Sequence, residues 1–122
     1  MELSGHSPFI VFDDVDINKV AYMAITAKFR NNGQVCISPN RFYIQEKRKE
    51  EFINAFIEKT KKLKIGNGMD EGVQLGPLAT AKRLSEVEEL VDITKKEGAK
   101  VLLGGKRPSG FNKGYFLSLI HI

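Results

Sequence analysis

Residues 9–33, FIVFDDVDINKVAYMAITAKFRNNG, carry the pattern that decides the fold. The apolar run at 9–12 ends at Asp13-Asp14 and predicts a short buried strand. Asp16 is a suitable N-cap for a helix, and Asn32-Gly33 ends that helix. The apolar positions of the helix recur at helical spacing: Ile17, Val20, Ala21, Ala24 and Ala27. The stretch therefore predicts a strand, a helix and a loop in succession.

The same alternation continues along the chain. Residues 41–45 predict a second strand, and the amphipathic residues from about 48 to 64 predict a second helix. A glycine-rich ordered loop is expected at 65–79, followed by a third helix at about 80–96 that stops at Gly98. The apolar residues expected on the inner face of this third helix are Leu84, Val87, Leu90 and Val91. Residues 99–103 predict a third strand.

Strands separated by helices of this length indicate the α/β class with parallel pairing. We expect a partial three-layer parallel sheet with flanking helices. Three strands make an incomplete sheet, so further strands and helices from outside the segment are expected to cover it. One domain is expected over 1–116.

Composition excludes several classes of protein. The 122 residues are 42% hydrophobic and 28% charged, as in an ordinary globular domain. No run of 18 apolar residues and no signal peptide is visible, so we expect no membrane association and a cytoplasmic location. The net charge of +4 is concentrated on the solvated face of the second helix, without a nucleic-acid-binding motif, so no nucleic-acid partner is expected.

Cys36 is the only cysteine in the chain. A lone cysteine between Val35 and Ile37 is typically an inert buried residue. However, Gly33-Gln34 after a helix end offers the open, polar approach that a thiolate nucleophile needs. The backbone N–H of Cys36 could also donate to an oxygen on a bound carbonyl.

Glu2 lies upstream in Glu2-Leu3-Ser4-Gly5-His6. A glutamate in this position is normally solvated, but a carboxylate near a reactive thiol can activate a water molecule. His6 has no third group to orient it as a base, so we interpret it as a local structural residue.

These two motifs resemble the paired active-site signatures of the aldehyde dehydrogenase superfamily, and the resemblance covers residues 1–116. Further landmarks follow in the family's order: Phe9–Asp14, Asn40–Gln45, Gly66–Gly68, Gly76–Leu78 and Gly98–Val101. The resemblance implies an NAD- or NADP-dependent enzyme that oxidises an aldehyde to a carboxylic acid. It implies that the Cys36 thiolate attacks the aldehyde, that the thiohemiacetal gives up hydride, and that Glu2 activates water to hydrolyse the resulting thioester.

The same resemblance implies that the nucleotide-binding domain lies outside this segment, which alone would be inactive. The substrate would be a small aldehyde, with some likeness to the group that includes succinate-semialdehyde dehydrogenases. The parent protein would be a homodimer or homotetramer. Two alternatives remain open: a relative that transfers the acyl group to coenzyme A, and a non-catalytic structural relative.

Three features need separate interpretation. Gly66-Asn67-Gly68 does not join a strand to a helix, so it predicts a turn and not a dinucleotide fingerprint. No cluster with metal-ligand spacing is present, so no metal is expected. The apolar residues 117–122 depart from the family pattern, and we expect a truncated or non-native end there.

Overall fold

The computed structural model describes residues 5–117, and the chain divides into two compact units, Met1–Leu63 and Lys64–Ile122. The first unit contains strand β1 (Pro8–Val11), helix α1 (Ile17–Phe29), strand β2 (Arg41–Ile44) and helix α2 (Lys49–Thr60). Short 3-10 turns, η1 (Arg30–Gly33) and η2 (Glu46–Arg48), precede β2 and α2.

The two strands pair in parallel, from Pro8 opposite Arg41 to Val11 opposite Ile44. A parallel pair needs a crossover between its strands, and α1 supplies it. Asp16 caps this helix as expected, because its Oδ1 accepts from the backbone N–H of Lys19 at 3.2 Å. The predicted α/β class with parallel pairing is therefore confirmed.

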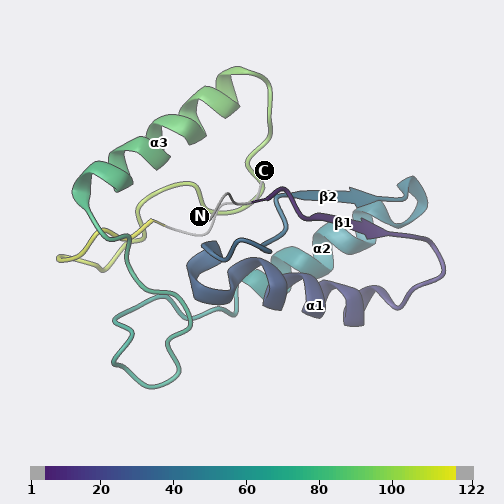
Figure 1. Cartoon of the computed structure of the whole chain (residues 1–122), viewed down its shortest axis with the longest axis horizontal. Coiled ribbons are helices and arrows are strands. Elements are labelled where there is room, and N and C mark those ends of the chain that lie inside the picture. The colour runs from purple at the N-terminus through teal and green to yellow at the C-terminus, as the bar shows by residue number, and fades with distance from the viewer. Residues whose placement is uncertain (1–4, 118–122) are drawn as a thin grey trace. The chain divides into compact units, whose positions relative to one another are not determined.

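Both helices cover the same face of the sheet (Figure 1). The side chains buried between them and the sheet form one apolar core: Val11, Ile17, Ala21, Ala24, Ile25, Phe52 and Phe56. Aromatic rings pack between the sheet and α2. The centroid of the Phe42 ring lies 5.6 Å from the ring centroid of Phe56 and 6.2 Å from that of Phe52. Burial of these rings stabilises this unit.

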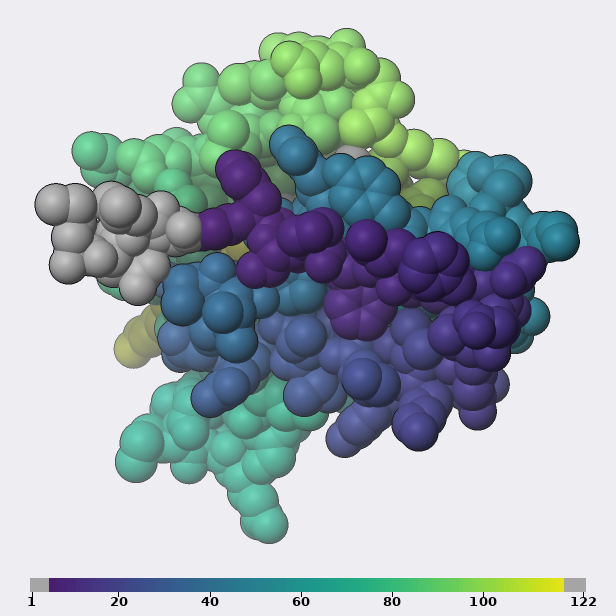
Figure 2. Space-filling view, turned by 45° about the vertical axis from the view of Figure 1, so that its right-hand side comes forward, coloured from purple at the N-terminus to yellow at the C-terminus, as the bar shows by residue number. Residues whose placement is uncertain are grey.

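Among the described residues of this unit, nothing covers the opposite face of the sheet. Ile10 and Tyr43 point away from the core and are 59% and 53% exposed, as alternation along a strand requires. β1 and its flanking residues, purple in Figure 2, lie at the surface. The unit thus has two layers, and the third layer stays a prediction for the complete domain.

Helix α2 is shorter than the predicted span of 48–64. After Thr60 the hydrogen bonds tighten to the 3-10 pattern, with Lys62 N–H donating to Lys59 O and Leu63 N–H to Thr60 O. These bonds end the helix four residues early.

The second unit contains helix α3 (Ala81–Lys96) and the loops on either side of it. Thr80 caps α3 by accepting from the Arg83 N–H at 3.1 Å, and Gly98 follows the helix with φ +96°. Buried Leu84 and Val91 form the inner face of α3, whereas Leu90, which the helical pattern also placed inside, is 54% exposed.

The expected third strand at 99–103 was wrong for the described residues. The segment forms no strand, and only Leu103 takes part in a bridge. A strand exists only when its backbone pairs with a neighbour, and a local apolar run cannot supply that neighbour. The loop at 65–79 is ordered as predicted, and it is closed by a bridge between Ile65 and Leu75.

In residues 5–117, no helix has the length and apolar character needed to cross a membrane. Within the same residues no group of three or more side chains that could hold a metal ion is found. The expected tail at 117–122 lies outside the described residues except for Leu117.

Candidate functional site

Cys36 lies in a tight turn a few residues beyond the end of α1. The turn is closed by the Ser38 N–H, which donates to the Val35 carbonyl at 2.8 Å and leaves Cys36 and Ile37 as its central residues. Cys36 is exposed. The structure therefore does not show the buried, inert cysteine that was the alternative from sequence.

Backbone geometry at the end of α1 sets the direction of this turn. Asn31, Asn32 and Gly33 have φ values of +49°, +57° and +75°, so the chain reverses through the left-handed region. Asparagine and glycine tolerate that region best. Gly33 is also packed closely, since a Cβ there would lie 3.1 Å from the Lys28 carbonyl oxygen.

Ser38 anchors the thiol turn to α1. Its side chain is 3% exposed, and its Oγ donates to the Lys28 carbonyl oxygen at 3.0 Å. Lys28 is in the last turn of the helix, where carbonyl groups lack partners within the helix. This single hydrogen bond gives a carbonyl group at the helix end its partner and also holds the thiol turn against α1.

Lys28 itself is partly buried at this junction. Loss of hydration disfavours the charged ammonium, so burial lowers the pKa of Lys28. The side chain therefore carries its positive charge at some cost in free energy.

The N-terminal segment lies beside the thiol turn. The Asn40 side chain donates from Nδ2 to the Gly5 carbonyl oxygen at 3.2 Å. A Cβ on Gly5 would lie 3.6 Å from the Cys36 carbonyl oxygen, so the two backbones are nearly in contact. The segment that follows Glu2 is therefore brought next to Cys36, although Glu2 itself lies outside the described residues.

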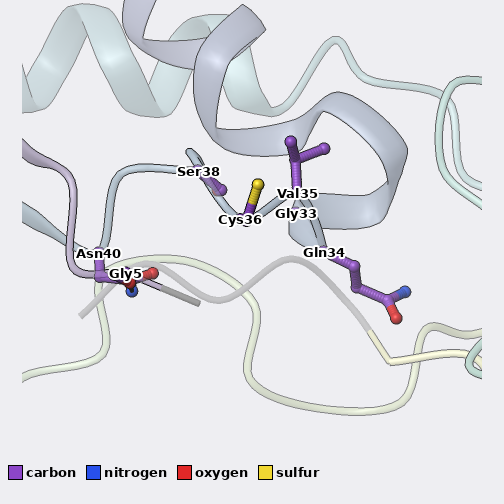
Figure 3. Close-up of a pocket in the computed structure, with 7 residues that line it drawn as sticks. All are labelled: Gly5, Gly33, Gln34, Val35, Cys36, Ser38 and Asn40. Carbon is purple, nitrogen blue, oxygen red and sulfur yellow. Dashed lines mark hydrogen bonds between the residues drawn. The ribbon is translucent and has the colours of Figure 1, made fainter. Parts of the chain in front are cut away.

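An open hollow of about 460 Å³ lies at this junction. Figure 3 shows the Gln34 side chain extending away from Cys36 on one flank, with Asn40 beside Gly5 on the other. The residues that line the hollow come from the N-terminal segment and the thiol turn: Gly5, Gly33, Gln34, Val35, Cys36, Ser38 and Asn40. Amides, a hydroxyl and a thiol in one open hollow suit a small polar substrate.

A second hollow of about 370 Å³ adjoins the same turn. Val35 lines both hollows, and Ile37 lines only the second. The other wall is the exposed side of α1 with the start of η1: Tyr22, Met23, Thr26, Ala27 and Arg30. The walls are mainly apolar, and Arg30 is the only charged side chain among these lining residues.

The sequence pointed to Cys36 and Gly33, and the structure places both in the wall of the first hollow. The anchoring roles of Ser38 and Asn40 and the position of Arg30 were missed. The sequence offers only a weak indication of these anchoring roles, because a serine and an asparagine shortly after a cysteine are ordinary loop residues. His6 is exposed, and it does not line either hollow.

Comparison with known proteins shows which family the chain resembles in sequence. The family model described as "Aldehyde dehydrogenase family" matches residues 1–120. Glutarate-semialdehyde dehydrogenase of Pseudomonas putida is 46% identical over 110 residues, which are 90% of this chain and 23% of that protein. The NADP(+) succinate-semialdehyde dehydrogenase GabD of Escherichia coli is 43% identical over 106 residues, or 87% of this chain and 22% of that protein.

Solved structures agree. A 3,6-anhydro-L-galactose dehydrogenase in complex with NAP superposes with a TM-score of 0.91 at 39% identity, covering 98% of this chain and 25% of that one. Betaine aldehyde dehydrogenase from Staphylococcus aureus, in complex with NAD+, gives 0.91 at 35% identity, covering 98% of this chain and 24% of that one. The chain thus spans about a quarter of the length of these relatives, and it belongs to the aldehyde dehydrogenase family.

Proposed function

We propose that this chain is the thiol-bearing segment of an NAD(P)-dependent enzyme that oxidises an aldehyde to a carboxylic acid, with Cys36 as the nucleophile. The observation that carries the proposal is the exposed Cys36 in an anchored turn beside an open hollow. A nucleophile must be accessible and held in place, and Ser38 and Gly33 supply the second property.

The chemistry begins at the sulfur. The Cys36 thiolate attacks the carbonyl carbon of the aldehyde, and negative charge develops on the carbonyl oxygen. Among residues 5–117 nothing accepts a hydrogen bond from the Cys36 backbone N–H. Within that part of the chain this N–H is available to donate to the developing oxyanion, and such a bond lowers the barrier to attack.

The described residues do not fit a dinucleotide. The connection between β1 and α1, residues 12–16, contains no glycine that would let a pyrophosphate approach a helix N-terminus. Gly66-Asn67-Gly68 lies in a loop where a Cβ at Gly66 would crowd Val73. We assign cofactor binding to other parts of the longer protein.

When bound, the nicotinamide would accept the hydride whose loss leaves an acyl group on Cys36. Release of that acyl group needs a water molecule and a base. Glu2 is the candidate base, supported by the proximity of Gly5 to Cys36. Product analysis separates this route from the alternative in which coenzyme A takes the acyl group. In the first case the free acid forms without coenzyme A; in the second the product is an acyl-coenzyme A thioester, and turnover requires coenzyme A.

The second hollow suggests a substrate class. Two relatives are named for succinate and glutarate semialdehydes, which carry a carboxylate at the end remote from the aldehyde. Arg30 offers a guanidinium in an otherwise apolar wall next to the thiol turn. An aldehyde with a short apolar chain and a remote carboxylate matches that arrangement.

The test uses the longer protein that carries this segment. Cys36→Ala should abolish aldehyde oxidation, and Cys36→Ser should leave only a trace, because a hydroxyl is a far weaker nucleophile at neutral pH. Retained activity in Cys36→Ala would contradict the proposal and favour a non-catalytic role for the thiol.

Arg30→Met tests the substrate class separately. It keeps a long side chain and removes the charge, so KM for a carboxylate-bearing aldehyde should rise about tenfold or more, the worth of one charge-assisted hydrogen bond. An uncharged aldehyde of the same length should be unaffected. Equal effects on both substrates would remove Arg30 from substrate recognition while leaving the role of Cys36 intact.

A further inference from the structure

The loop between α2 and α3, teal in Figure 1, contains a chemically fragile pair of residues. Asn67 is followed by Gly68, and both residues are exposed. Asparagine is the thermolabile member of this pair, and glycine places no side chain in the way of its own backbone nitrogen. The pair therefore has the composition that favours attack of a backbone amide on the preceding side chain.

The hydrogen bonds of the loop favour the same reaction. Asn67 Oδ1 accepts from the Met69 N–H at 3.1 Å, which folds the carboxamide over the peptide that contains the Gly68 nitrogen. A hydrogen bond to the carboxamide oxygen also draws electron density away from Cγ. Within the described chain the Gly68 N–H donates to no acceptor, so its nitrogen is not held away from Cγ.

We propose that Asn67 is a spontaneous deamidation site that converts to aspartate and isoaspartate in the native protein. The Gly68 nitrogen loses its proton to solvent base and attacks Asn67 Cγ, ammonia leaves, and a five-membered succinimide forms. Water then adds to either ring carbonyl and opens the ring. One molecule of water enters for each ammonia released, and no oxidant or further reactant is needed.

The sequence contains one other Asn-Gly pair, Asn32-Gly33, which serves as an internal control. Both residues of that pair are left-handed, and Gly33 is packed so closely that a Cβ would lie 3.1 Å from Lys28 O. At Gly68 no atom lies within 4 Å of the position that a Cβ would take, and its φ is outside the left-handed region. The fold therefore restrains the backbone of Asn32-Gly33, whereas the space around Gly68 leaves Asn67-Gly68 unrestrained.

Deamidation would change the loop in two ways. It adds a carboxylate close in sequence to Asp70 and Glu71. The backbone carbonyl of Glu71 accepts a hydrogen bond from Lys64 Nζ at 2.9 Å. The isoaspartate product also lengthens the backbone inside the turn closed by the Asp70 N–H and the Asn67 carbonyl oxygen, now 2.9 Å apart. Both changes loosen the loop with the age of the protein.

The test is peptide mapping by mass spectrometry after incubation in mildly alkaline buffer, with the native protein and the same protein in denaturant treated in parallel. Denaturant removes the folded contacts, so both Asn-Gly pairs react there at similar rates. In the native protein we expect Asn67 to keep close to its denatured rate while Asn32 falls well behind. An unchanged ratio between the two sites, or faster conversion at Asn32, would overturn the proposal.

Gly68→Ala tests the attacking nitrogen, and the space around Gly68 lets the fold accept the new methyl group. The variant should slow conversion at Asn67 and leave Asn32 unchanged. An undiminished rate at Asn67, or a product that is aspartate alone without isoaspartate, would show direct hydrolysis and overturn the succinimide route.

Discussion

The Asn40 side chain donates a hydrogen bond of 3.2 Å to the carbonyl oxygen of Gly5, 35 residues earlier in the chain. This bond joins the segment that contains the candidate base to the loop that follows the candidate nucleophile. The backbones meet at the same place, with the Gly5 Cβ position 3.6 Å from the Cys36 carbonyl oxygen. Asn40 is therefore a positioning residue for the two motifs.

Replacing Asn40 should weaken this junction. In the longer protein, Asn40→Ala and Asn40→Asp both remove the donor, and the aspartate variant keeps the shape. Loss of one such bond is worth about 1 kcal/mol, or about a fivefold fall in the rate of thioester hydrolysis if geometry at this step depends on it. Pre-steady-state kinetics should show an intact burst followed by slower turnover. A wild-type steady-state rate in Asn40→Asp would show that the bond has no catalytic consequence.

Ser38→Ala should destabilise the fold. The substitution leaves the Lys28 carbonyl at a partly buried helix end without the Ser38 donor, at a cost of about 1–3 kcal/mol. Denaturant unfolding measures the change as a lower midpoint with an unchanged slope. Thr26→Ala is the matched control, because its hydroxyl donates to Tyr22 O within exposed helix and should matter little. Equal midpoints for the two variants would refute the anchoring role of Ser38.

Gly33→Ala and Gly68→Ala should differ in stability. At Gly33 an alanine would adopt φ +75° and press against a backbone oxygen, so we expect a loss of about 1–3 kcal/mol. At Gly68 the new methyl group meets no atom within 4 Å, and removing a glycine restricts the unfolded chain, so stability should hold or rise slightly. Thermal unfolding of both variants checks the order, and the reverse order would be inconsistent with this turn geometry.

The pair Glu88–Arg107 should make stability depend on pH at the acid end. Arg107 donates to both carboxylate oxygens of Glu88, at 2.7 and 2.9 Å. These hydrogen bonds lower the pKa of Glu88 below its usual range. A depressed pKa means that the stabilisation is complete above the unfolded-state value and is lost as the pH falls through the folded-state value.

Arg107→Gln should therefore lower Tm near neutral pH, and its difference from wild type should shrink once the pH falls below the ordinary glutamate range. Added salt should reduce the effect, since the pair is partly exposed. Glu88→Gln is the control, because it removes the titrating group and should behave like Arg107→Gln at neutral pH. A difference that stays constant from neutral to acid pH would contradict this assignment.

Much of the fold could be predicted from local pattern. Asp16 caps its helix where the sequence placed a cap, α3 begins close to the predicted start at about residue 80, and the parallel pair at Phe9 and Phe42 follows from strands flanking a helix. The third strand and the inward direction of Leu90 were wrong. Both depend on what packs against the segment, which a local run of apolar residues does not specify.

By itself, the sequence determined the order of elements, the α/β class, the family and Cys36 as the candidate nucleophile. These depend on residue types and on spacings within a few turns of chain. Only the tertiary structure decided that Ser38 anchors the thiol turn, that Asn40 holds Gly5 and that Arg30 lines a hollow beside Cys36. Such contacts join segments brought together by burial of a common core, and the free energy of that burial belongs to no single segment.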